Sequence, residues 1–323
     1  MELTQNSYKE RTSLDSLVLL RGIAVLMVCF SHFGDFIIHD HTILEKGNYG
    51  VHIFFIISGF VIPFSLIKGN YSLSHYPQFI YKRFLRLHPP YLVALAGTIL
   101  LIYFKHFVYQ LPLTENTGSI LKSLVYAHWP VENPVFWTLL VEAEYYIFIG
   151  VFFVVAIRYY KITFFILIPC LLLLSRMIPV TSYIYFLPFI VFFLIGMVGL
   201  FIYKKIGYAF INYVALLGLL IFTAIIFDVV VGVISLATIG FILTYRNKIP
   251  SIFKFPGKIS YSIYLIHYPL GAYFMQVIGR RISPNLVWLK FVVMFAFIFI
   301  LSWIFYKCFE EYFEGLSKKV KYQ

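Results

Sequence analysis

Long apolar runs separated by short polar breaks dominate this chain of 323 residues. A helix needs roughly 20 apolar residues to cross the hydrocarbon core of a bilayer, and lipid favours helices because their backbone groups are satisfied internally. The runs are long enough for such helices. They predict about ten spans, near residues 14–33, 49–67, 90–108, 136–157, 162–178, 183–203, 208–226, 229–245, 258–278 and 287–308.

Two details of the pattern bear on how the chain is organised. Little more than Asp228 separates the seventh span from the eighth. The first run is too long for a cleavable signal peptide, carries Arg21 and is followed by no small-residue cleavage pattern. Because no linker, repeat or low-complexity segment interrupts the runs, we expect a single integral-membrane domain over residues 1–323, with short termini flanking spans from about 14 to 308.

Composition narrows the class of protein. Hydrophobic residues make up 61% of the chain and charged residues 12%, and the mean hydropathy is +0.86. A soluble domain of this length has a far more polar surface, so we expect an all-α, polytopic transmembrane helical bundle. The cysteines, Cys29, Cys170 and Cys308, have no metal-binding or redox spacing and are interpreted as small apolar side chains. No metal is expected.

The basic residues predict the orientation in the membrane. With ten spans, 18 of the 26 lysines and arginines, among them Lys9 and Arg11, fall on the side of the two termini; seven fall on the other side, and Arg21 lies within a span. The positive-inside rule then places both termini in the cytoplasm and the 34–48 loop outside. The same bias accounts for the net charge of +12 without a nucleic-acid partner. We expect the protein in the cell (inner, cytoplasmic) membrane.

Arg21 and His32 are polar residues inside the first span. Eleven residues separate them, so an α-helix places them on one face, roughly 16 Å apart. An arginine this deep costs at least ~2.5–3.5 kcal/mol on a lone helix, and Arg21 should therefore face protein or water. Either it forms a structural ion pair with Glu142 or Glu144, or it belongs to a site. His32 is either an interfacial histidine or part of that site.

Polar side chains on other spans favour a site. Carboxylates within a span are costly unless paired, so at least one glutamate of the fourth span should face the bundle interior. We therefore expect a polar core, with His32 and an acid toward its outer mouth. The other polar residues are Ser58 beside Gly59 in the second span, Glu142 and Glu144 in the fourth, and Ser260, Tyr264 and His267 on one stripe of the ninth.

Two arginines mark the opposite mouth of this core. Arg83 and Arg86 lie one helical turn apart, just before Pro89 and Pro90, which we expect to open the third span. Arginines near a helix start make a forked anion site, here at the cytoplasmic mouth. The alternative is that they only mark the cytoplasmic side of the membrane.

Five motifs, in order, resemble those of integral-membrane acyltransferase family 3, whose members O-acylate surface glycans and other acceptors. They are Arg21 and His32 with ten residues between them, GVHIFFIISGF (50–60), RFLRLHPPY (83–91), FWTLLVEAEYY (136–146), which includes Trp137, and KISYSIYLIHYPL (258–270). The chain departs from the family pattern at Thr138, Ala143 and Glu144. Its terminal motif, which begins at Glu310, lacks the usual proline.

The resemblance implies acyl-CoA, expected to be acetyl-CoA, as a donor that approaches from the cytoplasm. It implies an acceptor hydroxyl on the outer side, on a cell-surface polysaccharide or a lipid-linked sugar. Some relatives carry an extracytoplasmic hydrolase-like domain, for which this chain has no room. The roles implied are phosphate binding for Arg83 and Arg86, general base for His32, orientation of the imidazole or neutralisation of Arg21 for Glu142, oxyanion stabilisation for Ser58 or Tyr264, and support for Glu144, Ser260, His267 and Trp137.

A transporter or flippase of a lipid-linked glycan is the alternative from another class, because buried charges and a polar core suit it equally well. Transporters commonly have repeated halves with broken helices at matching positions, and the sequence shows no such symmetry. A sensor of sterols or lipids has no residue pattern in its favour. The sequence therefore favours the acyltransferase.

Overall fold

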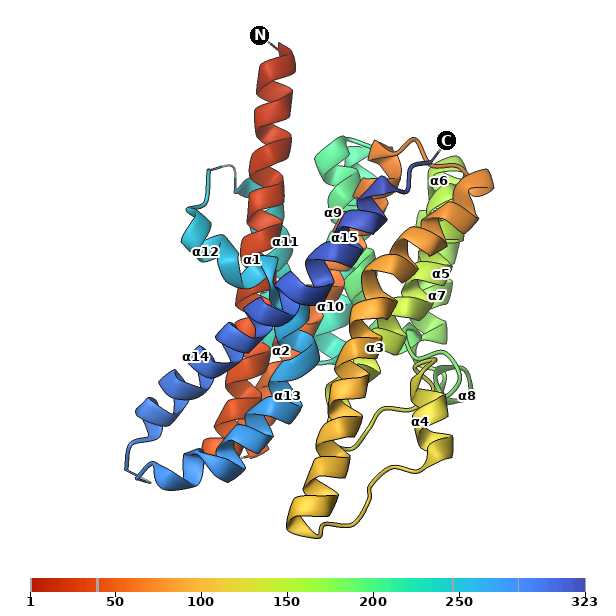
Figure 1. Cartoon of the computed structure of the whole chain (residues 1–323). Helices are drawn as coiled ribbons and strands as arrows, with labels where there is room; N and C mark the ends of the chain where they lie inside the picture. Colours follow the sequence, from red (N-terminus) through yellow and green to blue (C-terminus); the bar gives the residue numbers. More distant parts are fainter. Residues whose placement is uncertain (1, 39–40, 246, 284, 323) are drawn as a thin grey trace.

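The computed structural model of the protein is a bundle of helices (Figure 1). It describes residues 2–38, 41–245, 247–283 and 285–322, and the side chains in these ranges except those of residues 2–14, 41–46, 48 and 280. Within these ranges the chain forms no strand. The prediction of an all-α, polytopic membrane bundle is confirmed.

Seven helical runs of the described chain are long and apolar enough to cross a bilayer. They belong to α1 (Glu2–Ile38), α2 (His41–Lys68), α3 (Tyr76–Tyr109), α5 (Trp137–Arg158), α9 (Ile190–Lys204), α10 (Ala209–Ile226) and α14 (Val287–Phe305). The fifth, eighth and ninth predicted spans are helical as well, but two of them are shorter. They correspond to the run Tyr160–Leu174, to α11 (Val229–Thr244) and to α13 (Ser260–Val277).

Short elements complete the chain. The α-helices among them are α4 (Thr117–Ser123), α6 (Tyr160–Ile162), α7 (Ile168–Leu174), α8 (Ile178–Thr181), α12 (Ser251–Lys258) and α15 (Glu311–Lys319). Two π-helical turns join α6 to α7 and α14 to α15, at Thr163–Leu167 and Tyr306–Glu310. The 3-10 turns are Leu73–His75, Pro134–Phe136, Leu187–Phe189 and Gly279–Arg281.

The start of the third span differs from the prediction. Helix α3 begins at Tyr76, and Pro77 occupies its first turn, where the missing N–H of proline costs nothing. Pro89 and Pro90 do not open the helix but lie inside it. Arg83 and Arg86 therefore lie within the body of α3, and no helix N-terminus contributes to an anion site beside them.

Two other predicted boundaries, at the 34–48 segment and at Asp228, can be compared with the structure. The 34–48 segment, expected as a loop, is largely helical, because α1 extends to Ile38 and α2 begins at His41. The residues of that expected loop at 39 and 40 lie outside the described chain. The separation of the seventh and eighth spans is confirmed: the Asp228 carboxylate accepts a hydrogen bond from the Val231 N–H at 2.8 Å and caps α11.

Helix α2 lies at the centre of the bundle and packs against α1 and α9. It approaches α9 closely through glycines. A Cβ atom at Gly59 would lie 2.1 Å from the Phe193 carbonyl oxygen, and one at Gly196 would lie 2.1 Å from the Ile56 carbonyl oxygen. The two backbones therefore come into contact at these glycines, because neither carries a side chain. Small residues allow membrane helices to pack closely in this way.

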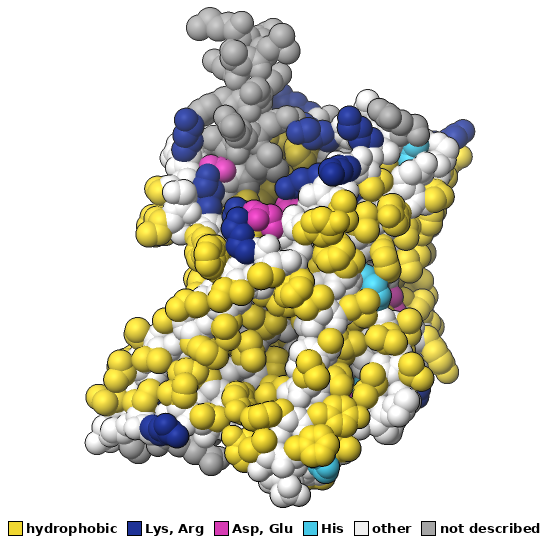
Figure 2. All heavy atoms as spheres, viewed as in Figure 1, with side chains coloured by type: hydrophobic (Ala, Val, Ile, Leu, Met, Phe, Trp, Pro, Cys, Tyr) yellow, Lys and Arg dark blue, Asp and Glu magenta, His cyan; other side chains and the backbone are white. Residues whose placement is uncertain are grey.

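The start of α1 and the end of α15 lie at the same end of the molecule (Figure 1). Lys and Arg side chains gather at this end, above an apolar band (Figure 2). Helix α15 lies against the first turns of α3 at this end. The Ser317 hydroxyl donates to the Lys82 carbonyl oxygen at 2.9 Å, and the Lys82 ammonium donates to the Val320 carbonyl oxygen at 3.3 Å. The C-terminal segment thus covers the part of α3 that carries Arg83 and Arg86.

Candidate active site

Two adjoining hollows lie inside the bundle. The first is lined by residues of α1, α2, α5 and α13, and the second also by residues of α3. Five residues line both: Arg21, Ile57, Ser58, Glu142 and Tyr261. The first hollow is further lined by Val51, Phe54, Phe55, Thr138, Leu139, Ser260 and Tyr264, and the second by Val61, Ile62, Arg83, Arg86, Leu87 and Tyr146. The polar core predicted from the sequence is thus a hollow with two parts.

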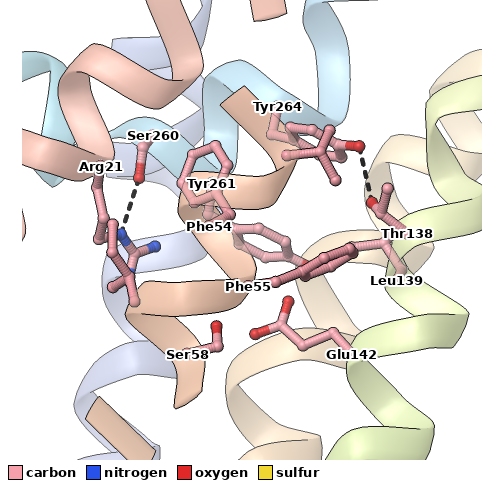
Figure 3. A pocket seen from close by; sticks show the side chains of 12 residues that line it. Arg21, Phe54, Phe55, Ser58, Thr138, Leu139, Glu142, Ser260, Tyr261 and Tyr264 are labelled. Carbon is pink, nitrogen blue, oxygen red and sulfur yellow. Dashed lines mark hydrogen bonds between the residues drawn. The ribbon is translucent and has the colours of Figure 1, made fainter. Parts of the chain in front are cut away.

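Arg21 lies where the two hollows join. Its Nε–H donates to the Ser260 hydroxyl oxygen at 3.2 Å, and its guanidinium points into the first hollow (Figure 3). The ion pair considered with Glu142 or Glu144 is not formed among the described side chains. The Glu142 carboxylate instead accepts a hydrogen bond from the Tyr146 hydroxyl, and Glu144 accepts one from the Phe186 N–H at 2.7 Å, so Arg21 stays available to the hollow.

Arg83 and Arg86 line the second hollow together, as their spacing predicts. The Arg83 side chain is buried and its Nη2 donates to the Ser65 hydroxyl at 2.5 Å, while its Nε has no hydrogen-bond partner. Arg86 lies 3.6 Å from the Glu314 carboxylate on α15. With Arg21, these residues place three guanidinium groups around one hollow.

Hydroxyl groups line the first hollow. The Tyr264 and Thr138 hydroxyls lie 2.7 Å apart, and both lie within hydrogen-bond distance of the Val135 carbonyl oxygen, so their protons are engaged. Ser58 has no hydrogen bond to any described group, and its hydroxyl points into the hollow (Figure 3). Of the two oxyanion donors considered, Ser58 is therefore the one with a proton to give.

His32 lines neither hollow. Its ring lies 5.2 Å from that of His267 on α13 and 5.0 Å from that of Tyr268, measured between centroids. His267 in turn lies 5.7 Å from the ring of Tyr264, which lines the first hollow. Arg21 and His32 both contact α13, but at different depths: Arg21 meets Ser260 in the hollow, and His32 meets His267 beyond Tyr264.

The comparison with known families decides the class of protein. A family model described as an acyltransferase domain matches residues 14–307, which is most of the chain. The chain belongs to acyltransferase family 3. It is a membrane acyltransferase that transfers groups other than aminoacyl groups. No curated protein and no solved structure matches it.

Two of the supporting residues predicted for the acyltransferase lie away from the hollows. Trp137 packs against the Phe189 ring at 5.2 Å, and Glu144 holds the Phe186 backbone, so both shape the start of α9. Ser260 and His267, in contrast, lie on one buried stripe of α13 with Tyr264. Their contacts run to α1, and those of Tyr264 run to α5.

Some residues of the acyltransferase hollow had no place in the sequence prediction. Tyr146 and Tyr261 line it, and the Tyr261 hydroxyl donates to the Leu87 carbonyl oxygen at 2.6 Å. A tyrosine in an apolar span gives no signal of such a role. Glu310 is buried near Arg21 and Arg86 and accepts hydrogen bonds from the backbone N–H and hydroxyl of Ser262. Its position in the terminal motif was the one available signal.

Proposed function

We propose that this acyltransferase moves an acyl group, expected to be acetyl, from cytoplasmic acyl-CoA to a hydroxyl of an extracytoplasmic acceptor. The acceptor class is a cell-surface polysaccharide or a lipid-linked sugar. The observation that supports this most is the order of groups through the bundle: arginines at one end of a polar hollow, hydroxyls at the other, and a histidine pair beyond them.

The donor end is the second hollow. Guanidinium groups bind phosphate through charge-assisted, forked hydrogen bonds. Arg83 and Arg86 would hold the coenzyme A phosphates, and the Glu314 carboxylate now lies at the position where an anion would meet Arg86. The hollow then leads past Arg21 toward Ser58, which gives the thioester a polar path into the bundle.

The chemistry needs a base for the acceptor hydroxyl. His32 is half-buried, and the acceptor nitrogen of a neutral imidazole can take the proton of a hydroxyl, so His32 suits this role. In the proposed step His32 takes the hydroxyl proton while that oxygen attacks the thioester carbonyl. The carbon–sulfur bond of the tetrahedral intermediate then breaks, and the thiolate sulfur recovers the proton from His32.

The proposed orientation puts both termini in the cytoplasm of the cell membrane. It rests on the bias of 18 basic residues against seven; five of these 25 have side chains outside the described part, namely Lys9, Arg11, Lys46, Arg246 and Arg280. Two further observations support it. The two termini lie at one end of the molecule, and basic side chains gather there (Figures 1 and 2).

The test presents radiolabelled acetyl-CoA to inside-out membrane vesicles that contain the protein. We expect label to appear in the lipid or glycan fraction facing the lumen, and His32→Ala to lower this transfer by about 10²–10⁴-fold, as removal of a general base does. Acetyl-CoA binding by purified His32→Ala should match that of the wild type. His52→Ala provides a control at a buried histidine that lines neither hollow.

Two outcomes would contradict the proposal. Turnover of His32→Ala near that of the wild type would show that the base lies elsewhere. Movement of a lipid-linked sugar across the vesicle membrane, without any acyl transfer, would show a flippase instead.

A further inference from the structure

His267 is fully buried on α13, just before a helix irregularity. Pro269 has no N–H, so the Leu265 carbonyl oxygen loses its helical partner. The Asn133 side-chain amide donates to that oxygen at 3.0 Å and fixes the helix there. His267 is thus held in one position on a rigid element.

The contacts of His267 determine which of its nitrogens carries the proton. Its Nδ1 lies 2.9 Å from the Tyr264 carbonyl oxygen and 3.1 Å from that of Ile263. Carbonyl oxygens only accept, so Nδ1 must be the donor. A fully buried ring is favoured in its neutral form, because burying an unpaired charge is costly. The Nε2 of His267 is therefore a bare acceptor, and it has no partner.

The ring of His32 also has a nitrogen without a hydrogen-bond partner. Its Nδ1 is also buried without a partner, and the two rings lie 5.2 Å apart between centroids. Buried polar atoms are normally hydrogen-bonded, so two unpaired nitrogens on neighbouring rings call for an explanation. A proton on Nδ1 of His32 would give a donor beside an acceptor. A proton on Nε2 would instead leave two lone pairs buried together.

We propose that His267 is a positioning residue: its Nε2 accepts the Nδ1–H of His32 and thereby leaves Nε2 of His32 free to act as the base. This inference rests on the proposed function of His32. In substrate-free structures such hydrogen bonds are often open and tighten when substrate binds. The role corresponds to that of the aspartate in a serine–histidine–aspartate triad, which fixes the histidine tautomer, here filled by a neutral ring.

The same contact supports the reaction step. When His32 takes the proton of the acceptor hydroxyl, its ring becomes an imidazolium with protons on both nitrogens. The Nδ1–H then remains on His32 and points at the lone pair of His267, while the proton on Nε2 passes to the leaving thiolate sulfur. His267 neither gains nor loses a proton in this step. It contacts His32 and not the substrate, so it acts only by positioning the His32 ring.

The test compares three variants of the full chain. His267→Phe removes the acceptor but keeps a ring, and His267→Gln retains an acceptor oxygen. His52→Phe is the matched control, because His52 is also buried, has an unpaired Nδ1 and stacks on Phe192 at 4.2 Å, yet lines neither hollow. We expect His267→Phe to lower turnover at saturating acetyl-CoA by about 10–100-fold, as loss of a residue that orients a histidine does. The KM for acetyl-CoA should not change, His267→Gln should recover part of the turnover, and His52→Phe should keep it.

A second measurement does not depend on activity. Nitrogen NMR of protein labelled in its histidines reports the tautomer of each ring, and the His32 signals are assigned with His32→Gln. We expect His32 protonated on Nδ1 in the wild type and a shift toward the other tautomer in His267→Phe. A His32 ring protonated on Nε2 in the wild type, or unchanged turnover of His267→Phe beside an active wild type, would overturn the inference. An inactive wild type with the expected tautomer would count against the proposed function and not against the histidine pair.

Discussion

Arg21 is the basic residue among the five that line both hollows, and its side chain offers both a charge and a planar fork of donors. The Nε–H is already engaged by Ser260, which orients the guanidinium. Arg21→Lys keeps the charge but not the fork, so we expect acyl transfer to fall at least tenfold while the protein still folds. Transfer and thermal unfolding in detergent measure the two effects. Wild-type transfer in Arg21→Lys would mean that a point charge is sufficient.

Arg21→Ala should have a further effect on stability. Glu142 lines both hollows with Arg21, and Glu310 is buried near Arg21. Removing the guanidinium leaves these carboxylates without a nearby positive charge. An uncompensated charge inside the bundle lowers the stability of the folded protein. We therefore expect a lower unfolding temperature for Arg21→Ala than for Arg21→Lys, measured on the same detergent preparations.

The arginines of α3 allow a test of donor binding. Removing one charge-assisted contact costs about 1.5–3 kcal/mol, so Arg83→Ala or Arg86→Ala should weaken acetyl-CoA binding tenfold or more. Arg158→Ala is the control, because Arg158 is an exposed arginine that lines neither hollow. Acetyl-CoA affinity is measured by calorimetry. If it is unchanged in both α3 variants, these arginines do not bind the donor and only mark the cytoplasmic side of the membrane.

At the scale of residues, the sequence predicts which side chains matter better than it predicts what they contact. Arg21, Ser58 and Glu142 stand out because polar groups in apolar spans are costly, and all three line the hollow. Their partners do not stand out. The histidine pair joins α1 to α13, and only the packing of helices distant in the chain brings such rings together.

At the scale of elements, the crossing of α2 and α9 depends on two glycines. A Cβ at position 196 would overlap the backbone of α2, so Gly196→Ala should destabilise the bundle by about 1–3 kcal/mol, the usual cost of overpacking. Gly218 on α10 has no atom within 4 Å of the position of an added Cβ. Gly218→Ala should therefore be neutral or stabilising, because alanine favours helix. Thermal unfolding of the two variants gives the comparison, and equal unfolding temperatures would contradict the close crossing.

The apolar pattern predicts the helices of this protein but not all of their ends. Hydrophobicity marks where a helix lies in lipid. The first turns of α3, from Tyr76 to Leu87, mix polar and apolar residues, so the apolar pattern did not predict them as part of the span. Pro89 and Pro90 were a misleading boundary signal, because a membrane helix tolerates proline where neighbouring groups re-satisfy the backbone. The same limit applies at α2, whose first turn at His41 precedes its apolar run.

At the scale of the whole molecule, the donor end of the hollow and the chain termini lie together. The Tyr322 ring, near the C-terminus, lies 5.5 Å from that of Tyr71, in the segment between α2 and α3. Glu314 on α15 faces Arg86. The C-terminal segment is therefore part of the wall at the arginine end. Under the proposed function, the donor comes from the side of the membrane on which this segment lies.

That dependence makes topology the decisive test of the proposed direction of transfer. We expect a reporter enzyme fused to the C-terminus to be active only in its cytoplasmic form, because 18 basic residues against seven favour that side. In a variant without the three native cysteines, Ser74→Cys lies between α2 and α3, and Thr114→Cys lies between α3 and α4; both positions are exposed. A membrane-impermeant thiol reagent applied to intact cells should label Thr114→Cys and not Ser74→Cys, and permeabilised cells should show both. Labelling of Ser74→Cys in intact cells, or an external C-terminal reporter, would place the arginine end outside and rule out a cytoplasmic donor.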